Sequence, residues 1–139
     1  MTPSDILARV HRAIDALIQA ADPYEGLMPS LLDRQSHEML LELPTAIEGQ
    51  RDGDRAYLGS NLIHDEAALY TMYALDRPGY TEAADRYLQR FTSHCTNTES
   101  GLFPWGEHAY WHLQEDRLGN SFDRSEERRV GKEGRSRWS

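Results

Sequence analysis

Apolar residues recur at helical spacing near the start of the chain. Thr2 is a typical N-cap residue, Pro3 favours the first helical position, and Asp5 puts an acid in the first turn. The residue before a proline avoids the helical region, so Asp22-Pro23 should end the helix. The pattern predicts a helix from about residue 3 to 21, whose apolar face is formed by Ile6, Val10, Ala13, Leu17 and Ala21.

Residues 24–60 have a different pattern, because glycines and prolines interrupt them too often for a long helix. Apolar residues at 30–33 and 37–41 predict two short strands around a polar turn at 34–36. Asp52-Gly53 is a strong signal for a further turn. We therefore expect one short β-hairpin-like segment in an otherwise helical chain.

A helical pattern returns after Ser60-Asn61, where either residue can cap a helix. Residues 62–76 are apolar on nearly every side after Glu66, which is typical of a buried helix. A second helix, from about residue 80 to 94, is amphipathic, and its apolar stripe is Ala84, Leu88, Phe91 and Cys95. The two helices predict an αα-hairpin with an inner and an outer member.

Composition and charge exclude several classes of protein. The chain has 139 residues, of which 39% are hydrophobic and 27% charged, as expected for one globular domain. Residues 1–123 hold nine basic and 20 acidic side chains, a net charge of −11 that would repel nucleic acid. No apolar run is long enough to cross a membrane, and the N-terminus has no signal peptide as written. With one cysteine, Cys95, no internal disulfide can form, so we expect a cytoplasmic protein without nucleic-acid or membrane partners.

The last segment, residues 124–139, differs from the rest of the chain. It carries a net charge of +3, includes the only lysine, Lys132, and has no apolar periodicity. Its sequence resembles the translation of a synthetic sequencing-library adapter, apart from Gly134, where the adapter gives cysteine. We therefore expect 1–123 to be the N-terminal part of a catalytic domain and 124–139 to be an artefactual, disordered tail. The alternative is a genuine basic arm that binds a partner.

The segment from Gly101 to Leu113 combines aromatic residues with two histidines and a glutamate. A proline and two glycines prevent a helix in its first half. Aromatic loop segments of this kind often bind ligands, because flat rings stack on sugar faces. The alternative is that Phe103, Trp105 and Trp111 close the top of a helical core.

The chain resembles the (α/α) toroid, or six-hairpin glycosidase-like, enzymes that act on carbohydrates. The resemblance lies in its inner and outer helices and in the segment between hairpins, Gly-Leu-Phe-Pro-Trp-Gly-Glu-His. The segment is similar to the Trp-Gly-x-His segment of the family 2 polysaccharide lyases, which are pectate lyases with an (α/α) barrel. The resemblance covers about residues 55–113 and implies that His108 helps to hold a divalent metal. Glu107 stands where that family has a small residue, and the family's later catalytic arginine, glutamate and second histidine would lie beyond Asp123.

The expected fold is thus mainly α, an incomplete (α/α) toroid or barrel fragment that would be inactive as truncated. Uronic-acid elimination needs a base and a cation that stabilises the resulting charge. We expect His108 as metal ligand, Glu107 and Asp65 as catalytic residues, and a substrate-binding set of Trp105, Trp111, Tyr110, Asn61 and His64. The predicted function is a metal-dependent lyase of acidic polysaccharide, with oligo- or polysaccharide as partner. Alternatives are a glycoside hydrolase, which needs two carboxylates about 5–10 Å apart, a sugar epimerase on the same barrel, or a noncatalytic glycan-binding helical scaffold.

Overall fold

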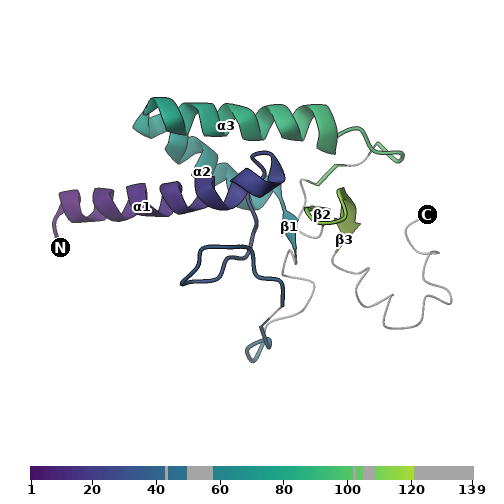
Figure 1. Ribbon diagram of the computed structural model, residues 1–139, viewed down its shortest axis with the longest axis horizontal. Helices are drawn as coiled ribbons and strands as arrows, with labels where there is room; N and C mark the ends of the chain where they lie inside the picture. Colours follow the sequence, from purple (N-terminus) through teal and green to yellow (C-terminus); the bar gives the residue numbers. More distant parts are fainter. Residues whose placement is uncertain (43, 50–57, 102, 105–108, 121–139) are drawn as a thin grey trace.

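The computed structural model describes residues 1–42, 44–49, 58–101, 103–104 and 109–120. About half of this part is helical, in keeping with a mainly α fold, and its α-helices are α1 (Pro3–Ala21), α2 (Leu62–Leu75) and α3 (Pro78–Arg90). A 3₁₀ turn (Asp22–Tyr24) follows α1, and a π-helical turn (Phe91–Cys95) continues α3. A small antiparallel sheet, in the order β1-β2-β3, consists of β1 (Gly59–Ser60), β2 (Ala109–His112) and β3 (Arg117–Asn120). The sheet lies at the end of the helical layer opposite the N-terminus (Figure 1).

Helix α1 has the bounds that the sequence predicts. The Thr2 hydroxyl accepts the backbone N–H of Asp5 at 3.2 Å, and the Asp5 carboxylate accepts the backbone N–H of Thr2 at 2.8 Å. This reciprocal capping box satisfies two otherwise unpaired donors at the start of the helix. At the other end, Glu25 and Gly26 adopt positive φ angles of 56° and 99°, which turn the chain away.

The predicted hairpin at residues 30–41 is present as a tight turn rather than as two paired strands. A single antiparallel bridge joins Leu32 to Met39. The Asp33 carboxylate accepts the backbone N–H groups of Gln35 and Ser36 at 2.8 and 2.7 Å, which fixes the turn. Backbone hydrogen bonds from Asp33 to Glu38 at 2.7 Å and from Leu40 to Leu31 at 3.0 Å join the two arms, so the segment is hairpin-like but too short to form strands. The turn predicted around Asp52-Gly53 lies outside the described residues.

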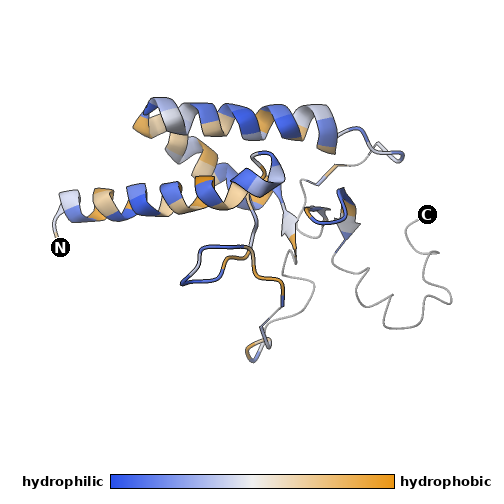
Figure 2. Cartoon of the chain, in the orientation of Figure 1, coloured by the Kyte–Doolittle hydropathy of each residue, from blue (hydrophilic) through white to orange (hydrophobic). Residues whose placement is uncertain are grey.

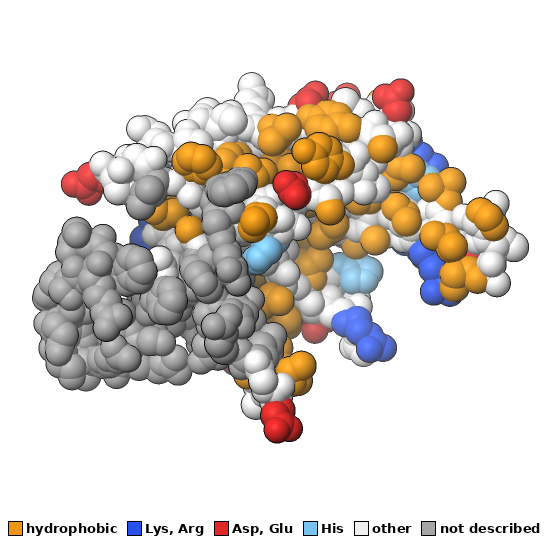
Figure 3. Space-filling view, turned by 180° about the vertical axis from the view of Figure 1, so that it is seen from behind, with side chains coloured by type: hydrophobic (Ala, Val, Ile, Leu, Met, Phe, Trp, Pro, Cys, Tyr) orange, Lys and Arg blue, Asp and Glu red, His pale blue; other side chains and the backbone are white. Residues whose placement is uncertain are grey.

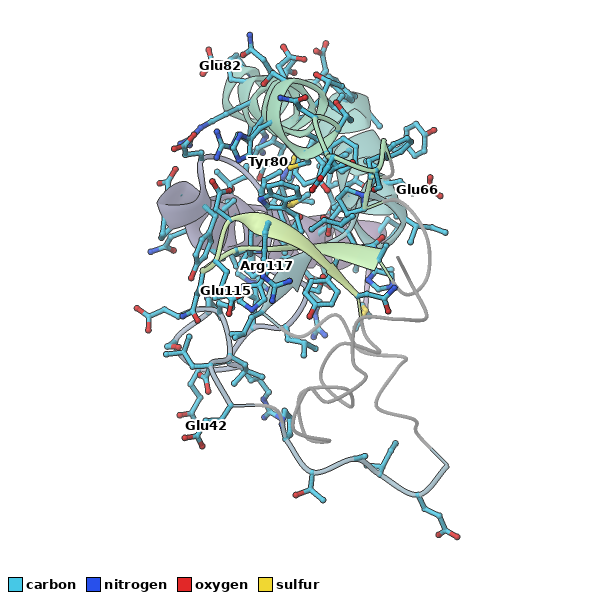
Figure 4. The ribbon with its side chains drawn as sticks, turned by 90° about the vertical axis from the view of Figure 1, so that its right-hand side faces the viewer. Glu42, Glu66, Tyr80, Glu82, Glu115 and Arg117 are labelled. Carbon is cyan, nitrogen blue, oxygen red and sulfur yellow. The ribbon has the colours of Figure 1, made fainter. Side chains whose placement is uncertain are left out.

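Helices α2 and α3 form the predicted αα-hairpin and pack against each other. The Asn61 side chain caps α2 by accepting the Ile63 N–H at 2.9 Å. Helix α1 joins them through Tyr80 of α3, whose hydroxyl donates to the Asp15 carboxylate at 2.8 Å; Figure 4 shows Tyr80 in the interior between the helices. The core that the three helices share includes Ala84, Phe91 and Cys95, which are three of the four residues of the apolar stripe predicted for the second helix of the hairpin. Its other members from the helices are Ile14, Ala21, Leu69, Met72 and Tyr87.

The prediction that α2 is buried on nearly every side is wrong. Only Asp65, Leu69 and Met72 are buried along its 14 residues, whereas Tyr70 is 70% exposed. Helix α2 is largely apolar in Figure 2, and hydrophobic side chains gather on the rear face of the molecule in Figure 3. We call the exposed apolar row of this helix the α2 stripe; it consists of Ile63, Ala67, Tyr70 and Ala74.

No helix within the described ranges combines the length and the hydropathy that a membrane span requires.

The sheet is organised around Tyr110 of the central strand. Its ring covers Gly59 on β1 and Gly119 on β3, so that Tyr110 is only 4% exposed. A Cβ atom on Gly59 would lie 2.3 Å from the Tyr110 Cδ2, and one on Gly119 would lie 2.7 Å from its Cε2. Glycine is therefore required at both positions, where an aromatic ring packs directly on the backbone. The second half of the segment expected to be a loop is thus the central strand of a sheet.

Candidate functional site

The start of α2 is where the aromatic segment meets the helical hairpin. Asn61 is 1% exposed, and its side-chain amide donates to the backbone carbonyl of Ala109. One residue further on, the N–H of Leu62 donates to the carbonyl of Pro104 at 3.3 Å. Pro104 and Ala109, the described residues on either side of 105–108, are therefore both hydrogen-bonded to the start of α2. Residues 105–108 lie outside the described residues, and with them the predicted Trp105, Glu107 and His108.

A buried polar cluster lies directly beneath this point. The Asp65 carboxylate accepts the Tyr87 hydroxyl at 2.7 Å and the Ser60 hydroxyl at 3.0 Å. Ser60 and Asp65 are 2% and 7% exposed, and Tyr87 is fully enclosed. The cluster connects β1, α2 and α3, and it brings Asn61 and Asp65, two of the predicted site residues, to one place.

The environment of Asp65 changes its acidity. Burial raises the pKa of the Asp65 carboxyl to about 6, although hydrogen bonds from Tyr87, Ser60 and the Asn61 backbone act in the opposite direction. Burial, and after it the nearby charge of Asp65, raises the pKa of Tyr87 as well, so that the phenol stays protonated and remains a donor. The carboxyl therefore titrates close to neutral pH. A raised pKa of this kind is common in catalytic groups and also occurs in structural networks.

A second polar cluster lies where the π-helical turn meets the β2–β3 turn. One Asp116 carboxylate oxygen accepts the Trp111 indole N–H at 2.9 Å and lies 2.8 Å from the His94 Nε2. The Arg90 guanidinium is 3.5 Å from the same oxygen and 3.0 Å from the Glu25 carboxylate. Burial alone would raise the pKa of Asp116, but the hydrogen bonds from Trp111 and His94 and the nearby positive charges outweigh it and lower the pKa. Asp116 therefore stays ionised and joins the β2–β3 turn to Trp111 of β2, to His94 of the π-helical turn and to Arg90 of α3.

The remaining predicted substrate-binding residues take different positions. Tyr110 and Trp111 are neighbours on β2, so their side chains project to opposite faces of the sheet. Trp111 is 6% exposed, belongs to the hydrophobic core, and meets the His94 ring edge-on at a centroid distance of 5.2 Å. This burial agrees with the alternative that the tryptophan closes the core. His64 is exposed in the first turn of α2.

The described residues do not form a metal site of their own. In residues 1–42, 44–49, 58–101, 103–104 and 109–120, no group of three or more histidine, cysteine, aspartate or glutamate side chains is placed to hold a metal ion. His112, near the predicted ligand in sequence, is 8% exposed, and its Nδ1 accepts the Glu115 N–H at 3.1 Å. His108, the predicted metal ligand, lies outside the described residues, so the metal site stays a prediction.

No family model, curated protein or solved structure matches this chain. Its class is therefore defined by its own fold and site: a mainly helical protein with a small antiparallel sheet that adjoins an αα-hairpin.

Proposed function

We propose that this chain belongs to a carbohydrate-active protein built from (α/α) hairpins, and that the protein is a metal-dependent lyase of acidic polysaccharide. The observation that carries the proposal is the attachment of the aromatic segment to the first turn of α2, through Asn61 to Ala109 and through Leu62 to Pro104. In the toroid enzymes that the sequence resembles, a segment of this kind crosses the open end of the barrel. An attachment beside the N-terminus of an inner helix is consistent with that role.

The roles of the residues follow from the chemistry of elimination. A base must remove the proton beside the uronate carboxylate, and a cation must stabilise the charge that develops. Glu107 and Asp65 are the acids proposed for proton transfer, and His108 would contribute to holding the cation. The Asp65 carboxylate accepts the hydroxyls of Ser60 and Tyr87, so these two donors would help to set its protonation.

A glycoside hydrolase is the second candidate, and the acidity of Asp65 favours it. A buried carboxyl with a pKa of about 6 keeps its proton in mildly acidic solution, as the general acid of a glycosidase must. This mechanism also requires a second carboxylate about 5–10 Å away. Glu66, the adjacent residue, is exposed and points outward in Figure 4, so Glu107 is the acid left to take that role.

The test compares the chain with a version in which residues 124–139 are replaced by the genomic continuation after Asp123. Both are incubated with polygalacturonate and with xylan, with calcium, manganese or a chelator. If the protein is the proposed lyase, unsaturated products that absorb ultraviolet light form only when metal is present. A hydrolase instead gives new reducing ends without that absorbance. His108→Ala should abolish product formation, and His37→Ala, at an exposed turn residue, is the matched control. The absence of both product and glycan binding in the continued chain would overturn the proposal.

A further inference from the structure

A shallow depression of about 650 Å³ lies beside the Asp116 cluster, between the segment 97–100 and strand β3. The π-helical turn Phe91–Cys95 directly precedes this segment, and π-helical turns are frequent at functional sites. Among the lining residues Asn97, Glu99 and Ser100 are exposed, and with the half-buried Thr98 we call them the rim, which carries neutral hydrogen-bonding groups and one carboxylate. Trp111 is buried and Leu118 half-buried, and we call these two apolar residues the floor.

The two other charged side chains that line the depression, Asp116 and Arg117, are already paired. Asp116, which also lines it, is held by His94 and Arg90. Arg117 donates from its Nε to the Glu115 carboxylate at 2.5 Å, and the two side chains lie together beside the β2–β3 turn in Figure 4. Glu99 has no ion pair within the described part of the chain, so the lining presents one uncompensated negative charge.

We infer that this depression binds a neutral sugar unit of a glycan. The choice of carbohydrate rests on the proposed function, and the depression adds to it a subsite and the charge class of its ligand. A sugar ring has an apolar C–H face and a rim of hydroxyl groups, which matches an apolar floor under amide, hydroxyl and carboxylate groups. A uronate unit at the same place would meet Glu99 in a strongly acidic chain and would be repelled.

The floor of the subsite is fixed before any ligand binds. The Trp111 indole is oriented by its hydrogen bond to Asp116 and by its contact with His94. Asp116 itself adopts a φ of 52° in the turn, a conformation that aspartate tolerates better than most residues. Binding therefore requires little reordering, but Trp111 offers only the small part of its ring that is not buried. We expect a weak site, with a Kd for one short oligosaccharide of about 1 mM.

The experiment uses the full chain with Trp105→Phe and Trp138→Phe, so that Trp111 is the only source of tryptophan fluorescence. The chain is titrated with xylohexaose, cellohexaose and hexagalacturonate to about 10 mM. We expect a saturable change in Trp111 emission with at least one neutral oligosaccharide, and binding about tenfold weaker for the acidic one. No change with either neutral ligand, or tighter binding of hexagalacturonate, would overturn the inference.

Two substitutions test which side chains are responsible. Asn97→Ala should weaken neutral binding at least about fivefold, because it removes an exposed amide at the rim, whereas Gln114→Ala, in the exposed β2–β3 turn, should not. Glu99→Gln should raise the affinity for hexagalacturonate and leave neutral binding within about twofold. An Asn97→Ala chain that binds as tightly as the parent would contradict the assignment.

The outcomes separate this inference from the proposed function. Cleavage of polysaccharide without any response of Trp111 would reject the subsite alone. A saturable response of Trp111 without cleavage in the continued chain would reject the enzyme and keep the subsite.

Discussion

Replacing Asp65 with asparagine should remove a pH-dependent loss of stability that the buried carboxyl causes. The pKa of this group is about 6 in the folded chain against an ordinary value of 3.8, so the folded state binds the proton more tightly than the unfolded state. The group's favourable contribution is therefore fully present below pH 3.8 and is lost as the pH rises through about 6. A difference of about two pKa units corresponds to roughly 3 kcal/mol between the two ends of this range.

Asparagine keeps the size of the side chain and one oxygen that accepts from Ser60 and Tyr87. Its amide N–H would face the backbone N–H of Asn61, which in the wild type donates to the carboxylate, and this mismatch costs about 1 kcal/mol. We therefore expect Asp65→Asn to be less stable than the wild type by about 1 kcal/mol at low pH. At pH 8 it should be more stable by about 2 kcal/mol, because the wild type then carries a buried charge.

The measurement is urea unfolding followed by circular dichroism at several pH values, for wild type and variant at low protein concentration. Subtracting the two curves removes the contributions of other carboxyls, such as Asp5 and Asp33, whose lowered pKa values give the opposite pH dependence. Glu82→Gln, at an exposed position that points outward in Figure 4, is the control and should follow the wild type. A difference that is constant with pH, or that favours the wild type increasingly as the pH rises, would refute this account of Asp65.

Three further predictions concern the sheet, the α2 stripe and the tail. Gly59→Ala should lower the free energy of unfolding, measured in urea, by about 1–3 kcal/mol, because its Cβ would overlap the Tyr110 ring. Gly79→Ala, where the space is open, is the control, and an equal loss in both variants would contradict the packing argument. The exposed α2 stripe should make the chain self-associate and bind a hydrophobic dye, and Tyr70→Glu should reduce both, whereas Thr92→Glu should leave both unchanged. Dye binding that persists in Tyr70→Glu would mean that the stripe is not its source. Re-sequencing the locus should replace residues 124–139 with an unrelated continuation, and finding these residues in native genomic DNA would sink the adapter interpretation.

Local signals were sufficient to predict the helices. Thr2 and Pro3 mark the start of α1, and Asn61 marks the start of α2, because capping depends on residues close in sequence. The turn between α2 and α3 follows in the same way from Pro78. Local signals do not show which face of α2 is exposed, since an all-round apolar helix indicates that its surface should be covered but does not identify what covers it.

The sheet and the polar clusters depend on contacts between distant residues. Ser60 pairs with Trp111, and Asp65 reaches Tyr87 on another helix, so no local periodicity shows either contact. Strands β1 and β2 have two and four residues, too few for a clear alternation of apolar and polar positions. The Asp116 cluster likewise required the π-helical turn, which brings His94 to the β2–β3 turn and which the amphipathic pattern of the helix did not indicate.

The pairing of β1 with β2 has a consequence for how the chain folds. The two strands lie immediately before α2 and well after α3, so joining Ser60 to Trp111 closes a loop of about 50 residues. Forming the helical hairpin first shortens the effective loop, because it brings the two ends to the same side of the helices. In stopped-flow refolding, the helical circular dichroism signal should therefore appear before the burial of Trp111, and a substitution that weakens the α2–α3 contact should delay the second signal more than the first.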